Sequence, residues 1–290
     1  MGFPLDHSIS VAIAQTGSVL ADLNKNLENH YALIEQAIEQ KNDIIIFPEL
    51  SLTGYSLKDA VYDVAITTKD KKLDQLKKFS QHINIIFGMV ELSDRFEIFN
   101  SLLFLEDGHL LSKHRKVYLP TYGLFEEKRY FSAGNRLKAF DSKWGRIGLL
   151  ICEDMWHPTS GIILAQDGAT IIFVASAGVA RGMDGQKKPG NVTTWEVLNR
   201  ALGISTTSYI VFANRVGVED GLMFWGGSEV IDPHGHEMNK APLFTETLLE
   251  TKLDLLKLKH ARINTRLLSD EKLDVLVDEF NRIKKTTREY

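Results

Sequence analysis

The sequence is poor in cysteine. Its 290 residues contain a single one, Cys152, so no disulfide can form within the chain. Disulfides are rare in the reducing cytoplasm, and we therefore expect a cytoplasmic protein. The N-terminus, MGFPLDHSIS, has no positively charged stretch that leads into an apolar one, so it does not resemble a secretory signal.

Long apolar runs and blocks of one charge are also missing. The longest apolar runs, 44–47 and 169–175, have the length of strands and fall far short of the roughly 18 residues that a membrane helix needs. Lysine and arginine are scattered, and the formal net charge is −4, so no basic surface for nucleic acid is indicated. We expect a protein that binds neither a membrane nor nucleic acid.

Histidines with the spacing of metal ligands are absent. The chain has nine histidines, and none of them form a cluster with other typical ligands. His234 and His236 flank Gly235 in what reads as a hairpin tip, which indicates a turn rather than a metal site. We expect neither a metal nor a cofactor.

What the sequence does contain is an alternation of short apolar strands and amphipathic helices, without a repeat or a linker. This alternation predicts one α/β layered domain over residues 1–290. Strands are predicted at 8–15, 43–47, 83–90, 98–106, 109–114, 146–151, 170–175 and 209–214, and 227–232 and 248–253 are expected to form a further antiparallel pair. Helices are predicted with an apolar face from Leu20 to Ile38, and at about 68–80, 158–166, 192–203 and 269–288, the last one capped by Ser269.

The segment 148–156 is the first of three that could carry chemistry. An apolar strand runs directly into Cys152, and polar residues and a helix start follow. A side chain at such a strand-to-helix turn projects outward, and backbone N–H groups face the same space. A thiol in that position can act as a nucleophile. The alternative is a buried cysteine that serves as a small apolar residue.

An acid and a basic run complete the candidates. Glu49 follows a buried strand and Pro48, so its carboxylate lies at a strand end, where the active sites of α/β proteins gather. It could take the proton of a thiol, or it could satisfy the N–H groups of a helix start.

Lys116 belongs to the basic run 113–116. Such a run usually forms a solvated surface. If this lysine turns inward, however, its positive charge could stabilise an anionic intermediate.

In this order, the three segments resemble the nitrilase, or carbon-nitrogen hydrolase, superfamily. The first glutamate, the lysine and the cysteine of the family match 47–49, 115–116 and 151–153. Its second glutamate, in an F-x-E-x-x-x-F-x-x-G stretch, matches Glu127 between Phe125 and Gly134. The segments 214–217 and 226–228 match in the later half, so the resemblance runs from about residue 8 to residue 255.

Within the superfamily, the chain resembles the glutaminase domain of glutamine-dependent NAD synthetases in the segments 47–55, 119–131 and 152–156. By that resemblance, Tyr122, Trp156 and Ser176 line the amide pocket. Two features differ from this branch. The 290 residues contain no Ser-Gly-Gly-x-Asp-Ser loop of an ATP-using synthetase domain, and 176–178 read Ser-Ala-Gly where the branch usually has Asn-Ala-Ser-Pro.

The resemblance implies a four-layer αββα sandwich, with two mixed sheets face to face and helices outside, that forms homodimers or larger homo-oligomers. It also implies a reaction on a small-molecule amide, without a cofactor. Glu49 takes the proton of Cys152, and the thiolate attacks the amide. Lys116 and the backbone N–H after Lys116 or after Cys152 stabilise the oxyanion, Glu49 then serves the leaving amine and the hydrolytic water, and Glu127 holds Lys116.

Four functions stay open. The first is hydrolysis of a small linear amide through a thioester, which releases ammonia or an amine and a carboxylic acid. The second is a glutaminase that supplies ammonia to a separate synthetase, and the third is hydrolysis of a nitrile. The fourth is a catalytically silent binding protein of this fold. The presence of Glu49, Lys116 and Cys152 favours an enzyme.

Overall fold

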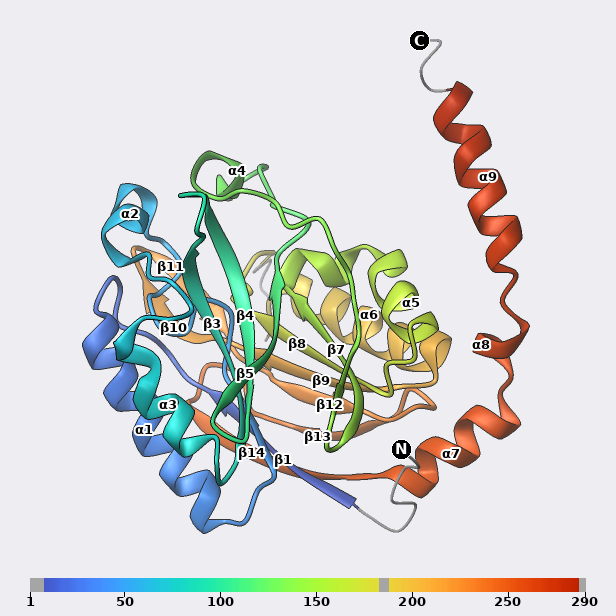
Figure 1. Cartoon of the computed structure of the whole chain (residues 1–290), viewed down its shortest axis with the longest axis horizontal. Helices are drawn as coiled ribbons and strands as arrows, with labels where there is room; N and C mark the ends of the chain where they lie inside the picture. The colour runs from blue at the N-terminus through green and yellow to red at the C-terminus, as the bar shows by residue number, and fades with distance from the viewer. Residues whose placement is uncertain (1–7, 183–187, 287–290) are drawn as a thin grey trace.

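The computed structural model of the chain describes residues 8–182 and 188–286. The N-terminal residues 1–7, on which the expectation of no secretory signal rests, lie outside the described residues, as do 183–187 and 287–290. Two six-stranded sheets form the centre of the molecule (Figure 1). In spatial order, the first sheet consists of β14 (Thr247–Asp254), β1 (Ser8–Gln15), β2 (Ile44–Ile46), β3 (Asn84–Leu92), β4 (Ile98–Glu106) and β5 (His109–Arg115). The second consists of β13 (Glu237–Lys240), β12 (Glu229–Ile231), β9 (Tyr209–Asn214), β8 (Ile171–Ser176), β7 (Gly145–Ile151) and β6 (Phe140–Ser142).

The remaining elements are a hairpin and the helices. The hairpin pairs β10 (Val216–Glu219) with β11 (Leu222–Trp225). The α-helices are α1 (Leu23–Glu39), α2 (Val61–Val64), α3 (Asp74–Phe79), α4 (Glu127–Tyr130), α5 (Pro158–Gln166), α6 (Gly190–Thr206), α7 (Leu255–Asn264), α8 (Leu267–Asp270) and α9 (Leu273–Thr286). Short 3-10 helices are η1 (Lys58–Ala60), η2 (Lys71–Leu73) and η3 (Cys152–Trp156).

Apolar side chains of both sheets fill the space between them. Val11 and Ile46 of the first sheet belong to the same buried cluster as Leu149, Phe173 and Val211 of the second. Burial of a side chain of this size stabilises the fold by roughly 1.5–3 kcal/mol. The two sheets therefore pack face to face, as the family resemblance implied.

Helices cover the outer face of each sheet. Leu27 and Ile34 of α1 pack with Phe47 on the outer face of the first sheet, and Leu164 of α5 and Trp195 of α6 pack on the outer face of the second. Both sheets are mixed, because β1, β2 and β3 run parallel between antiparallel neighbours, and so do β7, β8 and β9. The expected α/β fold, an αββα sandwich with two mixed sheets, is confirmed.

The parallel strands decide where functional side chains gather. Glu49 comes shortly after β2, Cys152 directly after β7, and Ser176 is the last residue of β8. Because neighbouring parallel strands end at the same edge of a sheet, the residues at their carboxyl ends meet. Lys116 reaches this edge from the end of β5, an antiparallel strand of the first sheet.

The antiparallel pair expected between 227–232 and 248–253 is wrong. β12 pairs with β9 and β13 in the second sheet, whereas β14 pairs with β1 in the first. The turn after β12 does form a hairpin, but its partner strand is β13, whose sequence Glu-Met-Asn-Lys lacks an apolar alternation. The local pattern predicted both strands and gave no information on their partners.

The helix expected over 269–288 is divided into two. α8 ends at Asp270, Glu271 has an extended backbone with ψ 132°, and α9 begins at Leu273. Ser269 does not cap α9, because it lies within α8, where its hydroxyl donates to the carbonyl of Arg266. The predicted end at 287–288 lies outside the described residues. α9 stands away from the sandwich (Figure 1).

Two other predicted helices are shorter than expected. α1 begins at Leu23, after Asp22, whose carboxylate accepts the N–H of Lys25 and so caps the helix. Leu20 is consequently outside the helix and exposed. The lysine-rich segment 68–80 contains the 3-10 turn η2 and the short helix α3 in place of one helix.

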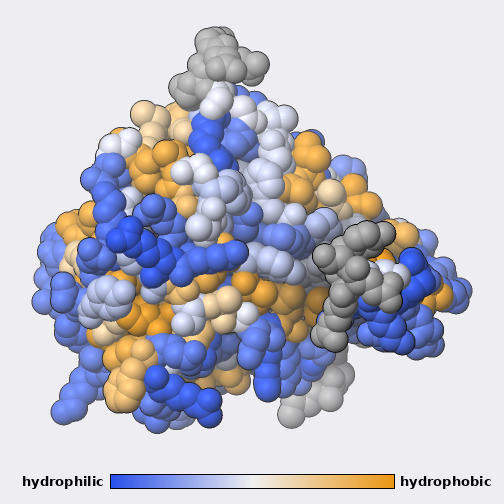
Figure 2. All heavy atoms as spheres, turned by 90° about the horizontal axis from the view of Figure 1, so that it is seen from above, coloured by the Kyte–Doolittle hydropathy of each residue, from blue (hydrophilic) through white to orange (hydrophobic). Residues whose placement is uncertain are grey.

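The surface of the molecule mixes hydrophilic and hydrophobic residues. On the face seen from above, the two kinds are interspersed (Figure 2). Within residues 8–182 and 188–286, no helix has both the length and the apolar content that a membrane crossing requires.

Candidate active site

Cys152 occupies the strand-to-helix turn that the sequence predicted. It follows β7 directly, begins η3, and has a φ of 45°, in the left-handed region that costs a non-glycine residue roughly 1–3 kcal/mol. The side chain is half-buried, and the hydroxyl of Ser176 donates to its Sγ at 3.4 Å. The turn thus points the thiol from the end of β7 toward the end of β8.

Glu49 is buried and held by three donors from different segments. Its Oε1 accepts hydrogen bonds from Asn100 Nδ2 at 2.8 Å and from Lys116 Nζ at 2.7 Å, and its Oε2 accepts the N–H of Ala177 at 2.9 Å. Asn100 lies on β4, and Ala177 follows β8. The carboxylate therefore lies where the two sheets meet, with a fixed orientation.

Lys116 is turned inward, with a fully buried side chain. Its Nζ donates to Oε1 of Glu49 and to Oε1 of Glu127, each at 2.7 Å. Burial by itself lowers the pKa of Lys116, but the carboxylates of Glu127 and Glu49 outweigh burial and hold the pKa well above its ordinary value. Lys116 is therefore an ammonium ion at neutral pH.

A glycine allows the chain around Lys116 to pack tightly. Gly134 donates its N–H to the carbonyl of Lys116 at 2.7 Å. A Cβ at Gly134 would lie 2.1 Å from the carbonyl oxygen of Arg115. This is too close for any side chain, so the position requires glycine. Gly134, at the end of the 125–134 motif, thus contacts the backbone of the lysine segment on the side that faces away from β4.

Glu127 begins α4 and is buried. Its Oε1 accepts hydrogen bonds from Lys116 Nζ and from the hydroxyl of Tyr55, each at 2.7 Å. Its Oε2 has no hydrogen-bond partner among the described residues. Burial raises the pKa of Glu127 to about 7, the charge of Lys116 opposes the rise, and the charge of Glu49 adds to it. This oxygen is therefore open to a hydrogen-bond donor that does not belong to the described residues.

The thiol of Cys152 is protonated in the resting protein. Burial raises its pKa well above the ordinary value, and the negative charge of Glu49 raises it further. The ammonium of Lys116 and the hydroxyl of Ser176 act in the opposite direction without reversing the shift. A reaction at this sulfur consequently needs a base that removes the proton as the sulfur attacks.

Asp154 joins the cysteine segment to the lysine segment. Its Oδ1 accepts the N–H groups of Val117 and Tyr118, each at 3.0 Å. Its Oδ2 accepts the N–H of Ile151 at 3.1 Å and a hydrogen bond from His114 Nε2 at 2.7 Å. The N–H of Val117, the residue after Lys116, was expected as a possible oxyanion donor; this expectation is wrong, because Asp154 already accepts that N–H.

The three pocket residues expected from the sequence lie in different surroundings. Tyr122 is 48% exposed, and its hydroxyl donates to the carboxylate of Glu153, the neighbour of Cys152, at 3.0 Å. Ser176 contacts the sulfur of Cys152 directly. Trp156 is half-buried, and its ring lies edge-on to Trp195 of α6, with 5.6 Å between ring centroids.

One cation lies near the exposed tyrosine. The guanidinium of Arg181 is 5.1 Å from the ring centroid of Phe125, and the rings of Phe125 and Tyr122 meet edge-on at 5.7 Å. The positive charge of Arg181 also acts on the hydroxyl of Tyr122. A positive charge, on Arg181, and a negative charge, on Glu153, thus both lie beside Tyr122.

The family profile described as carbon-nitrogen hydrolase matches residues 10–263. The chain belongs to the carbon-nitrogen hydrolase family. It is accordingly a hydrolase that acts on carbon–nitrogen bonds, as the sequence predicted, and its resemblance to the nitrilase superfamily is confirmed.

The relatives of this hydrolase fall into two groups by length. The glutamine-dependent NAD(+) synthetase of Acinetobacter baylyi is 29% identical over 283 residues, which are 98% of this chain and 50% of the relative. The omega-amidase of Mus musculus is 29% identical over 91% of this chain and 95% of its own length. A probable nitrilase of Schizosaccharomyces pombe is 26% identical over 88% and 92%. The chain spans about half the length of the synthetases that it matches.

Solved structures show the same fold. A carbon-nitrogen hydrolase from Helicobacter pylori aligns with this hydrolase at a TM-score of 0.84 and 25% identity, over 94% of this chain and 99% of the other. A glutamine-dependent NAD+ synthetase from Acinetobacter baumannii aligns at a TM-score of 0.76 and 29% identity, over 86% of this chain and 46% of the other.

A pocket of about 250 Å³ in the hydrolase borders Tyr55 and Glu127. Its apolar walls come from the segments 57–61 and 124–131 and from Leu222, and Lys58 and Asp220 pair across 2.8 Å at its exposed side. Within the described parts of the chain, no group of three or more His, Cys, Asp or Glu is arranged to hold a metal ion. Tyr55, Asn100 and Asp154 were not predicted as site residues, because their partners are distant along the chain.

Proposed function

We propose that this hydrolase cleaves the carbon–nitrogen bond of a small linear amide through a thioester on Cys152, and releases ammonia or an amine and a carboxylic acid. One observation carries the proposal: a buried ammonium, Lys116, is held between the carboxylates of Glu49 and Glu127, and its charge acts on a thiol at a strand-to-helix turn. These are the base, the positive charge and the nucleophile that acyl transfer needs.

In the first half of the reaction, Glu49 takes the proton of Cys152 as Sγ bonds to the amide carbon. The ammonium of Lys116 stabilises the negative oxygen that results, and the N–H of Glu153, in the first turn of η3, is the expected backbone donor. Glu49 then gives its proton to the nitrogen, the carbon–nitrogen bond breaks, and ammonia or an amine leaves. Cys152 remains as a thioester.

In the second half, Glu49 takes a proton from a water molecule whose oxygen attacks the thioester carbon. The carbon–sulfur bond breaks, the acid leaves, and the thiolate receives the proton from Glu49. Glu127 holds Lys116 throughout, and its free Oε2 can accept a hydrogen bond from the amide N–H. The starting state is restored without a cofactor.

A second candidate is the release of ammonia from glutamine for a separate synthetase. The similarity to glutamine-dependent NAD synthetases over 98% of this chain favours it. So do the charges beside Tyr122, because Glu153 and Arg181 are suited to the ammonium and carboxylate groups of an amino acid. Hydrolysis of a nitrile, the activity in the name of the Schizosaccharomyces pombe relative, is a third candidate with no feature of the site in its favour.

Ammonia release from a panel of substrates tests the proposal. The panel contains linear primary amides, glutamine, carbamoyl compounds and nitriles, each at the same concentration. We expect turnover of one or more amides, and we expect Cys152→Ala to abolish it while circular dichroism and the unfolding temperature stay as in the wild type. Turnover that survives Cys152→Ala would refute the mechanism.

The role of Glu49 is tested by mass spectrometry of the enzyme with a good substrate. We expect Glu49→Gln to lower turnover by roughly a hundredfold or more, because the amide side chain cannot carry the proton. It should either block acylation of Cys152 or leave the acyl group in place. Glu35→Gln, at an exposed position of α1, is the matched control. Equal rates for the two variants would exclude Glu49 as the base.

We also propose that the hydrolase acts in the cytoplasm as a homodimer, with α9 as part of the dimer contact. A single thiol that must remain reduced favours the cytoplasm, which fractionation of cells would test. The exposed apolar side chains of α9 support the dimer.

A further inference from the structure

Tyr55 lies outside the catalytic segments, yet its hydroxyl contacts the catalytic group. It donates to Oε1 of Glu127 at 2.7 Å, the same oxygen that accepts the ammonium of Lys116. The ring of Tyr55 is edge-on to Phe125 and to Phe224, with centroid distances of 6.3 and 6.1 Å. One oxygen of Glu127 thus receives a cation and a neutral donor from two different segments of the chain, and the other, Oε2, has no hydrogen-bond partner within residues 8–182 and 188–286.

A buried carboxylate holds the backbone of Tyr55. Oε1 of Glu219, at the end of β10, accepts the N–H groups of Tyr55 and Ser56 at 2.8 and 2.7 Å. Gly54 precedes them with a φ of 84°, and a Cβ there would lie 2.5 Å from Oε2 of Glu219. Glycine therefore allows the carboxylate to approach the backbone this closely.

Arg215 completes the chain of contacts. Its Nη2 donates to Oε2 of Glu219 and, at 3.0 Å, to the carbonyl of Ser18. Both charged side chains are buried, and the guanidinium lies 4.5 Å from the ring centroid of Phe224. Glu219 thus joins Arg215 to the backbone of Tyr55 and Ser56, although Nε and Nη1 of Arg215 have no hydrogen-bond partner among the described residues.

We propose that Tyr55 is a positioning residue: its hydroxyl fixes the carboxylate of Glu127, and thereby the ammonium of Lys116, and the Arg215–Glu219 pair anchors Tyr55. This role depends on the proposed function, because it concerns the same site. A role in packing alone would require only the ring, which contacts apolar neighbours on both sides. A variant that lacks only the hydroxyl therefore distinguishes positioning from packing.

Removal of the hydroxyl of Tyr55 should change the pKa of Glu127, an effect that a role in packing alone would not produce. The charged and titratable groups that face Glu127 are Lys116, Glu49, Tyr55 and the thiol of Cys152. Burial raises the pKa of Glu127 to about 7 and Glu49 adds to this, whereas Lys116 and the hydrogen bond from Tyr55 lower it. Without that hydrogen bond the pKa rises further, so more Glu127 is protonated at neutral pH and holds Lys116 less firmly. Activity should then recover only at higher pH.

The test compares Tyr55→Phe with Tyr62→Phe, whose ring is 62% exposed on α2, on the amide that the wild type hydrolyses best. For Tyr55→Phe we expect kcat to fall about tenfold to a hundredfold at pH 7, with less change in KM. The acid limb of the pH profile should move upward by about half a unit or more. Glu219→Gln should move the limb in the same direction. Profiles that superimpose on the wild type would overturn the proposal.

A second measurement needs no substrate turnover. Because Cys152 is the single cysteine, its alkylation by iodoacetamide reports on the charges around it across pH. We expect the pH dependence of alkylation to shift in Tyr55→Phe and to stay unchanged in Tyr62→Phe. A wild type that hydrolyses no amide but shows this shift would contradict the proposed function and leave the role of Tyr55 intact. An unshifted alkylation profile in an active enzyme would contradict the role of Tyr55 alone.

Discussion

At the level of single residues, one carboxylate decides how the nucleophile and the ammonium face each other. Asp154 accepts hydrogen bonds from the backbone on both sides of the site, at Ile151 before the cysteine and at Val117 and Tyr118 after the lysine. Burial by itself raises the pKa of Asp154, but the hydrogen bond and charge of His114 and the backbone N–H groups lower it below the ordinary value. The ionised form is therefore the one that holds the two segments together.

We predict that Asp154→Asn destabilises the protein and slows it. An amide of the same shape replaces one acceptor oxygen with a donor, so at least two of the four donors lose their acceptor. We expect the free energy of unfolding to fall by about 3 kcal/mol and kcat to fall at least about tenfold. Urea unfolding followed by circular dichroism, together with amide turnover, checks both effects.

Asp59→Asn is the control for this variant, because Asp59 is exposed and no hydrogen bond of its side chain is present among the described residues. It should leave stability and turnover unchanged. If Asp154→Asn had the same unfolding midpoint as this control, Asp154 could not be a structural link between the two segments.

The sequence predicted those site residues whose local pattern is distinctive. Cys152 follows an apolar strand directly, and Glu49 follows one after Phe47 and Pro48. Lys116 donates to Glu49, and its charge acts on the thiol of Cys152. Asp154 was not predicted, because an aspartate two residues after the nucleophile reads as an ordinary acid in a helix start. Its partners Val117 and Tyr118 lie 37 and 36 residues away. No periodicity in the sequence connects positions so far apart.

At the level of elements, strong local patterns gave accurate bounds. β1, β4, β9 and α5 begin and end where the sequence predicted, because each is a largely apolar run bounded by polar or turn residues. Short polar strands such as β13 have no such pattern and were missed. Pairing partners, as β12 and β14 show, depend on long-range packing that a local pattern does not contain.

The first sheet contains a cluster of charged side chains that spans the strands β3, β4 and β5. Glu91 on β3 accepts hydrogen bonds from Ser101 on β4 and from Lys113 and Arg115 on β5. Burial by itself raises the pKa of Glu91, but these three donors lower it from 4.5 to about 2. A shift of this size corresponds to roughly 3 kcal/mol of stability at neutral pH.

We predict that the stabilisation by the ionised carboxylate of Glu91 decreases as the pH falls. A carboxyl group whose pKa is lower in the folded protein stabilises it above pH 4.5 and loses the effect as pH falls toward 2. Glu91→Gln should therefore be less stable than the wild type by roughly 3 kcal/mol at pH 7, and by clearly less at pH 3.5. Urea unfolding at the two values measures the change.

Glu35→Gln serves as the control, since Glu35 is exposed and forms no ion pair among residues 8–182 and 188–286. Its difference from the wild type should be close to zero at both pH values. A Glu91→Gln difference that stayed constant between pH 7 and pH 3.5 would show that ionisation of Glu91 contributes nothing to stability.

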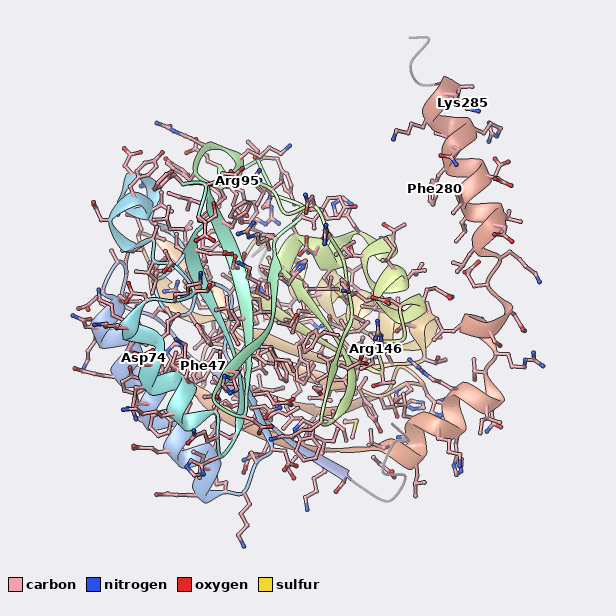
Figure 3. All side chains as sticks on the ribbon, in the orientation of Figure 1. Phe47, Asp74, Arg95, Arg146, Phe280 and Lys285 are labelled. Carbon is pink, nitrogen blue, oxygen red and sulfur yellow. The ribbon has the colours of Figure 1, made fainter. Side chains whose placement is uncertain are left out.

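At the level of the whole molecule, α9 stands away from the sandwich and carries exposed apolar side chains. Leu273, Leu276 and Phe280 follow each other at spacings of three and four residues, which is the pattern of a coiled-coil seam. Phe280 is 56% exposed, and Figure 3 shows it with Lys285 on α9, away from the sandwich. A helix of 14 residues with an open seam needs a partner to be stable in water.

The charges of α9 favour a second copy in antiparallel orientation. Asp274, Asp278 and Glu279 lie in its first half, and Arg282, Lys284 and Lys285 lie in its second half. Two parallel copies would place like charges side by side, whereas two antiparallel copies pair acids with bases and bring the seam of each helix against the other. A contact of this kind is self-complementary, as a twofold dimer requires.

We predict that Phe280→Asp converts the proposed dimer into a monomer at micromolar concentration, because a charge in the centre of the seam loses its solvation on pairing. The matched control is Val275→Asp on the same helix, since Val275 is 58% exposed but lies on the opposite side from the seam. Sedimentation velocity across a concentration series separates the outcomes. A wild type that remains monomeric, or a Phe280→Asp variant that remains dimeric, would contradict the pairing of α9. In the second case Val197→Asp, at a 60% exposed position of α6, would show whether the outer helices of the sandwich form the contact.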